Sequence, residues 1–146
     1  MKKTAQVAIA ASVLALIAGG FLLFHLIRES EPFKAERSDF IGAWAGPGGA
    51  RLTLHEDGTA IGDRVPSRFS GSASAVSATL SGSGTWSMGT RYTSLANQKI
   101  FVTLRTGPEQ EATVEVGAYG QGAKNGLYIS VSADTEEMFV FKKVPQ

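Results

Sequence analysis

The side chains that could do chemistry are few in this chain, and they do not form a catalytic pattern. His55 stands two residues before Asp57, and Ser67, Ser70 and Ser87 are candidate nucleophiles. A triad needs its nucleophile on a tight turn beside an oxyanion hole, and no such turn motif surrounds these serines. We therefore interpret His55 as an outward-facing strand residue, and we predict that the chain is not an enzyme.

Metal and glycoside chemistry find equally little support in the spacing of ligand-type residues. Zinc sites use several histidines or cysteines at fixed intervals, whereas this chain has two histidines and no cysteine. The acidic run 134–137 lacks the ligand number and the glycine of a calcium loop, so we interpret it as a turn. Carboxylates for glycoside hydrolysis could come from Asp57, Asp63, Glu111 and Glu115, yet nothing in the sequence fixes their separation. We predict no catalytic residue, no metal ligand and no cofactor.

Large aromatic side chains are the remaining candidates for a binding site. Ile100, Val102 and Leu104 occupy alternate positions and predict one buried face, which turns Phe101 outward. The same alternation predicts that Tyr128 and Phe139 also face outward, where they would form a contact patch for a protein, glycan or lipid. The full set of candidate ligand or partner contacts is Trp44, Phe69, Trp86, Phe101, Tyr119, Tyr128 and Phe139.

Short alternating segments separated by Gly, Pro, Asn and Asp must position these side chains. The strands that the pattern predicts are 40–44, 51–55, 59–65, 84–88, 99–105, 112–119, 127–131 and 138–141. Asp57-Gly58 predicts a tight hairpin turn, since glycine supplies the positive φ that such turns require. We therefore predict an all-β fold: an antiparallel barrel or strongly curved sheet of about eight strands, which can hold one small ligand or be filled by side chains.

The serine-rich segment 67–83 gives the weakest strand signal. It is either a mobile loop or a loosely specified strand, because it has few side chains large enough to anchor it. Two roles follow for Phe69 at its start. The ring either closes over the barrel end as a gate or packs against the core.

The N-terminus predicts a membrane helix. Residues 5–27 are almost entirely apolar, and a helix of that length spans roughly 34 Å, enough for a hydrocarbon core of about 30 Å. Lys2 and Lys3 precede it and predict a cytoplasmic N-terminus. We expect an anchor over 1–28, a polar linker over 29–39 and an extracytoplasmic barrel domain over 40–146. The alternative is a cleaved signal peptide, which would make the protein secreted.

Composition excludes several functions. The chain carries 14 basic and 13 acidic residues, so it lacks the positive charge that nucleic acid requires. The absence of cysteine removes disulfides and thiolate chemistry.

Four motifs carry a resemblance. They are Phe-Ile-Gly-x-Trp at 40–44, Leu-Thr-Leu-x-x-Asp-Gly-Thr at 52–59, Leu-Ser-Gly-Ser-Gly-Thr-Trp at 80–86 and Phe-Val-Phe-Lys-Lys at 139–143. In these motifs the chain resembles actinobacterial secreted or membrane-anchored proteins that have a small β-barrel domain of lipocalin-like appearance. The resemblance covers 40–143 and implies fold and location more than chemistry. Many of those proteins are lipid-anchored through a cysteine, which this chain does not have.

Two functions follow from this reasoning. The first is a non-enzymatic, membrane-tethered binding module for a small apolar ligand inside the barrel or for an envelope component at its rim. The alternative is a partner-binding protein, an inhibitor or accessory subunit of an envelope enzyme, with a filled barrel. An open pocket of a few hundred Å³ would favour the ligand, and a filled interior would favour the partner.

Overall fold

The computed structural model describes residues 15, 17–20, 31–71, 75–90 and 93–146. The chain divides into two compact units, Met1–Glu31 and Pro32–Gln146. The predicted membrane helix over 5–27 lies largely outside the described residues. Within the described part of the chain, no helix combines the length and the apolar character needed to cross a bilayer.

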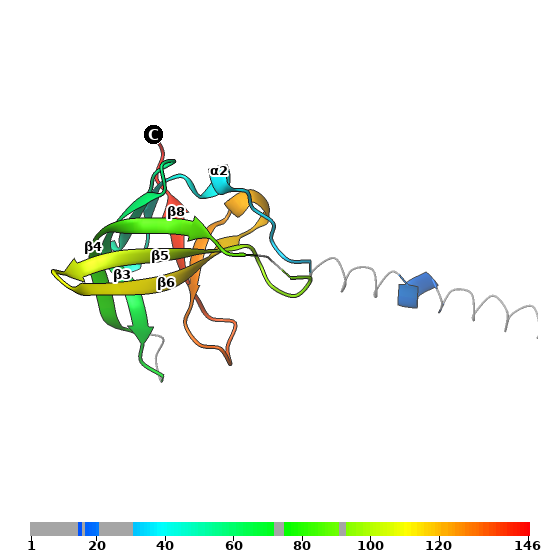
Figure 1. Cartoon of the computed structure of the whole chain (residues 1–146). Helices are drawn as coiled ribbons and strands as arrows, with labels where there is room; N and C mark the ends of the chain where they lie inside the picture. The colour runs from blue at the N-terminus through cyan, green and yellow to red at the C-terminus, as the bar shows by residue number, and fades with distance from the viewer. Residues whose placement is uncertain (1–14, 16, 21–30, 72–74, 91–92) are drawn as a thin grey trace, which may run out of the picture. The chain divides into compact units, whose positions relative to one another are not determined.

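The unit Pro32–Gln146 is a closed antiparallel barrel in which each strand pairs with its neighbours in the sequence (Figure 1). This confirms the all-β barrel that the alternating pattern predicts. Its eight strands are β1 (Gly42–Ala45), β2 (Arg51–Leu54), β3 (Thr59–Phe69), β4 (Val76–Met88), β5 (Lys99–Gly107), β6 (Gln110–Tyr119), β7 (Gly126–Ser130) and β8 (Met138–Lys143). The short helix α2 (Arg37–Phe40) precedes them, and the single 3-10 turns η1 (Pro47–Gly49) and η2 (Gln121–Ala123) lie between strands.

Inward-facing side chains fill the barrel. On β5, Ile100, Val102 and Leu104 are all fully buried, as the alternation predicts. The residues of 0–1% exposure come from nearly every strand: Phe40, Trp44, Leu52, Leu54, Ala60, Val65, Ile100, Val102, Leu104, Val116, Ala118, Leu127 and Phe141. Burial of this apolar surface is the main stabilising contribution to the fold.

Both tryptophans belong to this core, and each has its indole N–H satisfied. Trp44 Nε1 donates to the carbonyl of Phe40 at 2.9 Å, and Trp86 Nε1 donates to the carbonyl of His55 at 2.8 Å. Phe40 is the last residue of α2 and not part of the first strand, which begins at Gly42. Arg37 in the same helix places its guanidinium 4.2 Å from the Trp86 ring centre, a cation–π contact that covers the ring.

The hairpin formed by β3 and β4 is longer than the sequence predicts. β3 continues through Pro66 to Phe69, and residues 76–83 of the weakly patterned segment belong to the 13-residue strand β4, while 72–74 lie outside the described residues. Register shifts between Gly62 and Phe69 accommodate the proline, which cannot donate to a regular ladder. Small residues in β4 serve close packing, because a Cβ on Gly82 would lie 2.0 Å from a β5 carbonyl oxygen.

Residues preceding α2 are hydrogen-bonded to the barrel. The Phe33 carbonyl accepts from the Gln98 N–H at 2.9 Å, and the Lys34 carbonyl accepts from the Gly122 N–H at 2.7 Å. The side chain of Gln121 bonds this stretch twice, at the Lys34 N–H and the Pro32 carbonyl. These bonds explain why the compact unit begins at Pro32.

Candidate functional site

The barrel wall opens between β6 and β7. β6 pairs with β5 from Gln110 to Gly117, but it pairs with β7 only over 117–119. Beyond that point β7 follows β8, where Ile129 pairs with Phe139 and Ser130 with Met138. In the described part of the chain, β6 therefore has no strand partner on its β7 side over 110–116. We call this opening the seam.

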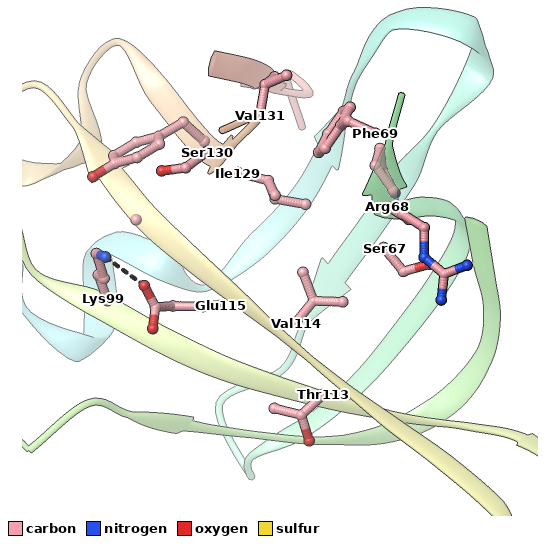
Figure 2. Close-up of a pocket in the computed structure, with 13 residues that line it drawn as sticks. Ser67, Arg68, Phe69, Lys99, Thr113, Val114, Glu115, Ile129, Ser130 and Val131 are labelled. Atoms are coloured by element: carbon pink, nitrogen blue, oxygen red, sulfur yellow. Dashed lines mark hydrogen bonds and ion pairs between the residues drawn. The ribbon is translucent and has the colours of Figure 1, made fainter. Parts of the chain in front are cut away.

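A cavity of about 520 Å³, here called the seam pocket, occupies this opening. Its lining comes from the end of β3, the first residue of β5, the middle of β6 and the end of β7 (Figure 2). The residues are Pro66, Ser67, Arg68, Phe69, Lys99, Thr113, Val114, Glu115, Gly117, Tyr128, Ile129, Ser130 and Val131. Figure 1 shows the β3–β4 hairpin and the loop after β7 projecting from the same end of the barrel, opposite α2.

The part of the pocket that faces the barrel core is apolar. Figure 2 shows Val114 on one side of the pocket, with Ile129 and Phe69 across from it. Val114 and Ile129 are each only 7% exposed. The Phe69 ring lies 6.2 Å from Phe139, which in turn meets Phe141 edge-on at 5.2 Å. An aromatic row thus connects the pocket wall to the barrel core.

The outer part of the pocket is polar. Lys99 and Glu115 form an ion pair across neighbouring strands, drawn as a dashed line in Figure 2. The Tyr128 ring lies against Gly117, and its hydroxyl accepts a hydrogen bond from Asn97 Nδ2 at 3.1 Å. The Asn97 side chain also accepts from the Phe33 N–H at 2.7 Å. The rim is therefore held by hydrogen bonds to the segment that precedes α2.

Of the seven aromatic residues predicted to contact a ligand or partner, Phe69 and Tyr128 line the seam pocket. Trp44 lines a separate cavity of about 250 Å³ beside α2, and Trp86 lies in the core under Arg37. Tyr119 packs edge-on against Phe33 at 5.9 Å. Phe69 packs against the core cluster, which is the second of its two predicted roles.

Of the three aromatic residues predicted to face outward, Phe101 and Tyr128 do so and Phe139 does not, and only Phe101 is exposed. Phe101 does face outward and is 40% exposed. Tyr128 also lies on the outer face, but it is only 7% exposed because it lies against Gly117 and Asn97. Phe139 points inward, since it shares its face with the fully buried Phe141 two residues later. The alternation of β8 alone does not show which face is inside.

Two of the polar candidates from the sequence, Ser67 and Glu115, line the seam pocket, whereas His55 and Asp57 lie apart from it. His55 is exposed after β2, and Asp57 caps the following turn. The hydroxyl and backbone N–H of Thr59 donate to Asp57 at 2.7 and 2.9 Å, and these bonds hold the pKa of the Asp57 carboxyl below its usual value. The acidic run 134–137 follows β7, and no group of three potential metal ligands occurs among the described residues.

Sequence reasoning missed the residues that define the seam pocket, among them Lys99, Val114 and Ile129. The sequence shows the alternation of apolar and polar residues on these strands. The pocket, however, depends on where two strands stop pairing, and no local sequence pattern indicates that point. Comparison of the chain with protein-family models, curated proteins and solved structures finds no match. The resemblance to actinobacterial lipocalin-like proteins stays an expectation.

Proposed function

We propose that this chain is a binding protein, not an enzyme, and that it holds a protein partner at the seam. The filled interior carries the proposal. Among the described residues, twelve inward-facing strand residues and Phe40 of α2 form a core in which each is no more than 1% exposed, so a ligand inside the barrel would have to displace packed side chains. The seam pocket supplies the open, partly apolar surface that the interior lacks.

The composition of the pocket supports a macromolecular partner. Its wall combines buried apolar side chains with an outer ion pair at Lys99 and Glu115. Protein interfaces commonly have this arrangement, with an apolar centre and a polar rim. An envelope protein, such as an enzyme that this chain inhibits or assists, is the partner class we propose.

A small apolar ligand in the seam pocket is the second candidate. The volume of about 520 Å³ falls within the range of about 300–1,000 Å³ for small-molecule sites. Phe69, Val114 and Ile129 would contact the ligand, and it would lie in the wall of the barrel and not in its centre.

We further propose that the barrel is tethered outside the cell membrane through residues 5–27. The apolar length of that segment and the paired lysines before it support this location. A tether would keep the seam close to envelope partners and raise their effective concentration.

Site-specific photo-crosslinking in the cells that make the protein tests the proposal. A benzophenone amino acid replaces Thr113, which is exposed on β6 and lines the seam pocket. The matched control replaces Arg51, which is exposed on β2. We expect a cross-linked species larger by a protein's mass from position 113 and not from position 51.

Mass spectrometry of the products separates the two candidates. An added mass of a few hundred daltons at position 113 would show that the occupant of the seam pocket is a small ligand and not a protein. Equal labelling at positions 113 and 51, or none at either, would contradict a site at the seam.

A further inference from the structure

We propose that the seam takes an extended polypeptide segment, which adds to β6 as a further strand over 110–116. This inference rests on the proposed function, since it names the occupant of the same pocket. The segment it describes alternates apolar residues with lysine or arginine. Three observations carry it: an open strand side, an apolar wall facing that side, and an acidic surround.

The open side of β6 is long enough for strand addition. Seven residues, 110–116, have no β7 partner, and at about 3.4 Å per residue they extend for roughly 24 Å. Exposed strand edges usually carry a proline or an inward-pointing charge that blocks further pairing. β6 has neither, because its inward positions are Ala112, Val114 and Val116. Its main-chain groups are therefore open to a new strand.

The pocket provides different surroundings for the two faces of such a strand. Side chains directed inward would meet Val114, Ile129 and Phe69. Side chains directed outward would pass Thr113 and Glu115 on the neighbouring strand. Because side chains alternate along a strand, the matching segment alternates apolar and polar residues.

The charge around the seam selects the polar residues of that segment. Five carboxylates lie on β6, on the turn before it and on the loop that follows β7: Glu109, Glu111, Glu115, Asp134 and Glu136. Three cationic side chains lie on the strands beside them, Arg68 on β3 and Lys99 and Arg105 on β5, and two of these pair with Glu115 and Glu111. The excess of negative charge favours lysine or arginine at the outward positions.

The same charges disfavour a second copy of this chain as the occupant. Antiparallel pairing of β6 with its own copy about Thr113 would place Glu111 opposite Glu115 on both sides of the symmetry axis. Like charges at directly opposite positions destabilise a strand pair. A basic segment avoids this repulsion.

The test measures binding of a synthetic peptide to the full chain in lipid nanodiscs. The probe is a blocked seven-residue peptide of alternating valine and lysine, and backbone amide shifts of the ¹⁵N-labelled protein report the site. We expect shifts concentrated in 110–116 and in Ile129 and Ser130. A peptide with glutamate at each lysine should bind at least tenfold more weakly.

N-methylation of the peptide distinguishes strand addition from side-chain binding. Along an added strand, alternate N–H groups point toward β6 and the others point toward solvent. Methylating the first set should weaken binding at least tenfold, and methylating the second set should change it less than threefold. Equal effects of both sets would overturn the inference and leave the proposed function standing.

A protein variant tests the charge contribution without touching the core. Replacing Glu109 and Glu111 by lysine should weaken binding of the valine–lysine peptide about tenfold, whereas Glu56→Lys, at the exposed β2–β3 turn, should not. Absence of shifts for every peptide up to millimolar concentration would also overturn the inference. Cross-linking at position 113 would then decide the proposed function independently.

Discussion

At Gly117, the absence of a side chain lets the Tyr128 ring lie across the neighbouring strand. A Cβ at this position would come within 2.4 Å of the ring. Gly117 and Tyr128 are direct cross-strand partners, at the point where β6 and β7 stop pairing. An aromatic ring over a glycine protects a strand at such a site and helps to fix its register. This pair lies where the seam begins.

We expect Gly117→Ala to lower the free energy of unfolding by roughly 1–3 kcal/mol, because the added methyl group overpacks the Tyr128 ring. Urea unfolding measures the change. Gly71→Ala is the matched control, since nothing lies within 4 Å of its added Cβ, and it should be nearly neutral.

A second comparison tests the cause of that loss. In a Tyr128→Ala background, Gly117→Ala should cost much less, because the ring that it meets is gone. A Gly117→Ala protein as stable as the wild type would show that Tyr128 does not depend on the glycine.

Among the elements, the β2–β3 hairpin shows how a local motif fixes a turn. Gly58 has a φ of +87°, as the Asp57-Gly58 prediction requires, and its N–H bonds to the His55 carbonyl at 3.1 Å. Thr59 donates twice to the Asp57 carboxylate. The turn is also hydrogen-bonded to β4, because the backbone N–H of Trp86 donates to the Gly58 carbonyl at 2.8 Å.

We expect Thr59→Val to raise the pKa of Asp57 toward its usual value, because it removes the hydroxyl bond that lowers it most. A lowered folded-state pKa adds stability above the unfolded value of about 3.9, and that stability is lost as pH falls through the folded pKa. The stability difference between wild type and variant should therefore shrink below pH about 4. Carbon NMR titration of the Asp57 carboxyl measures the shift, and identical titrations would contradict the assignment.

For the whole molecule, the segment that precedes the barrel is the feature that would set its location. Residues 5–27 predict an anchor with its N-terminus in the cytoplasm. The barrel would then follow at once, because the compact unit begins at Pro32.

We expect protease added to intact cells to remove an epitope tag placed after Gln146 and to leave a tag placed before Met1. The lysines at 2 and 3 are the reason, since they keep the N-terminus inside. Immunoblotting with cells opened by detergent as the control measures both tags. Loss of the N-terminal tag from the mature protein would indicate a cleaved signal peptide.

The sequence by itself determined the number of strands, the Asp57-Gly58 turn and the buried face of β5. These properties follow from local pattern, because side chains alternate with period two and few residues accept a positive φ. Both tryptophans lie on segments that the pattern predicts as strands, 40–44 and 84–88, and both are at most 4% exposed.

Only the tertiary structure decided which residues form the site. Three features depend on neighbours that are distant in the sequence: the length of β4, the inward orientation of the Phe139 side chain and the burial of the Tyr128 side chain. The seam depends on where β7 leaves β6 to follow β8, which no alternation encodes. Periodicity specifies the two faces of each strand. A pocket between strands depends instead on which strands pair and over what length, and this pairing involves residues that are distant in the sequence.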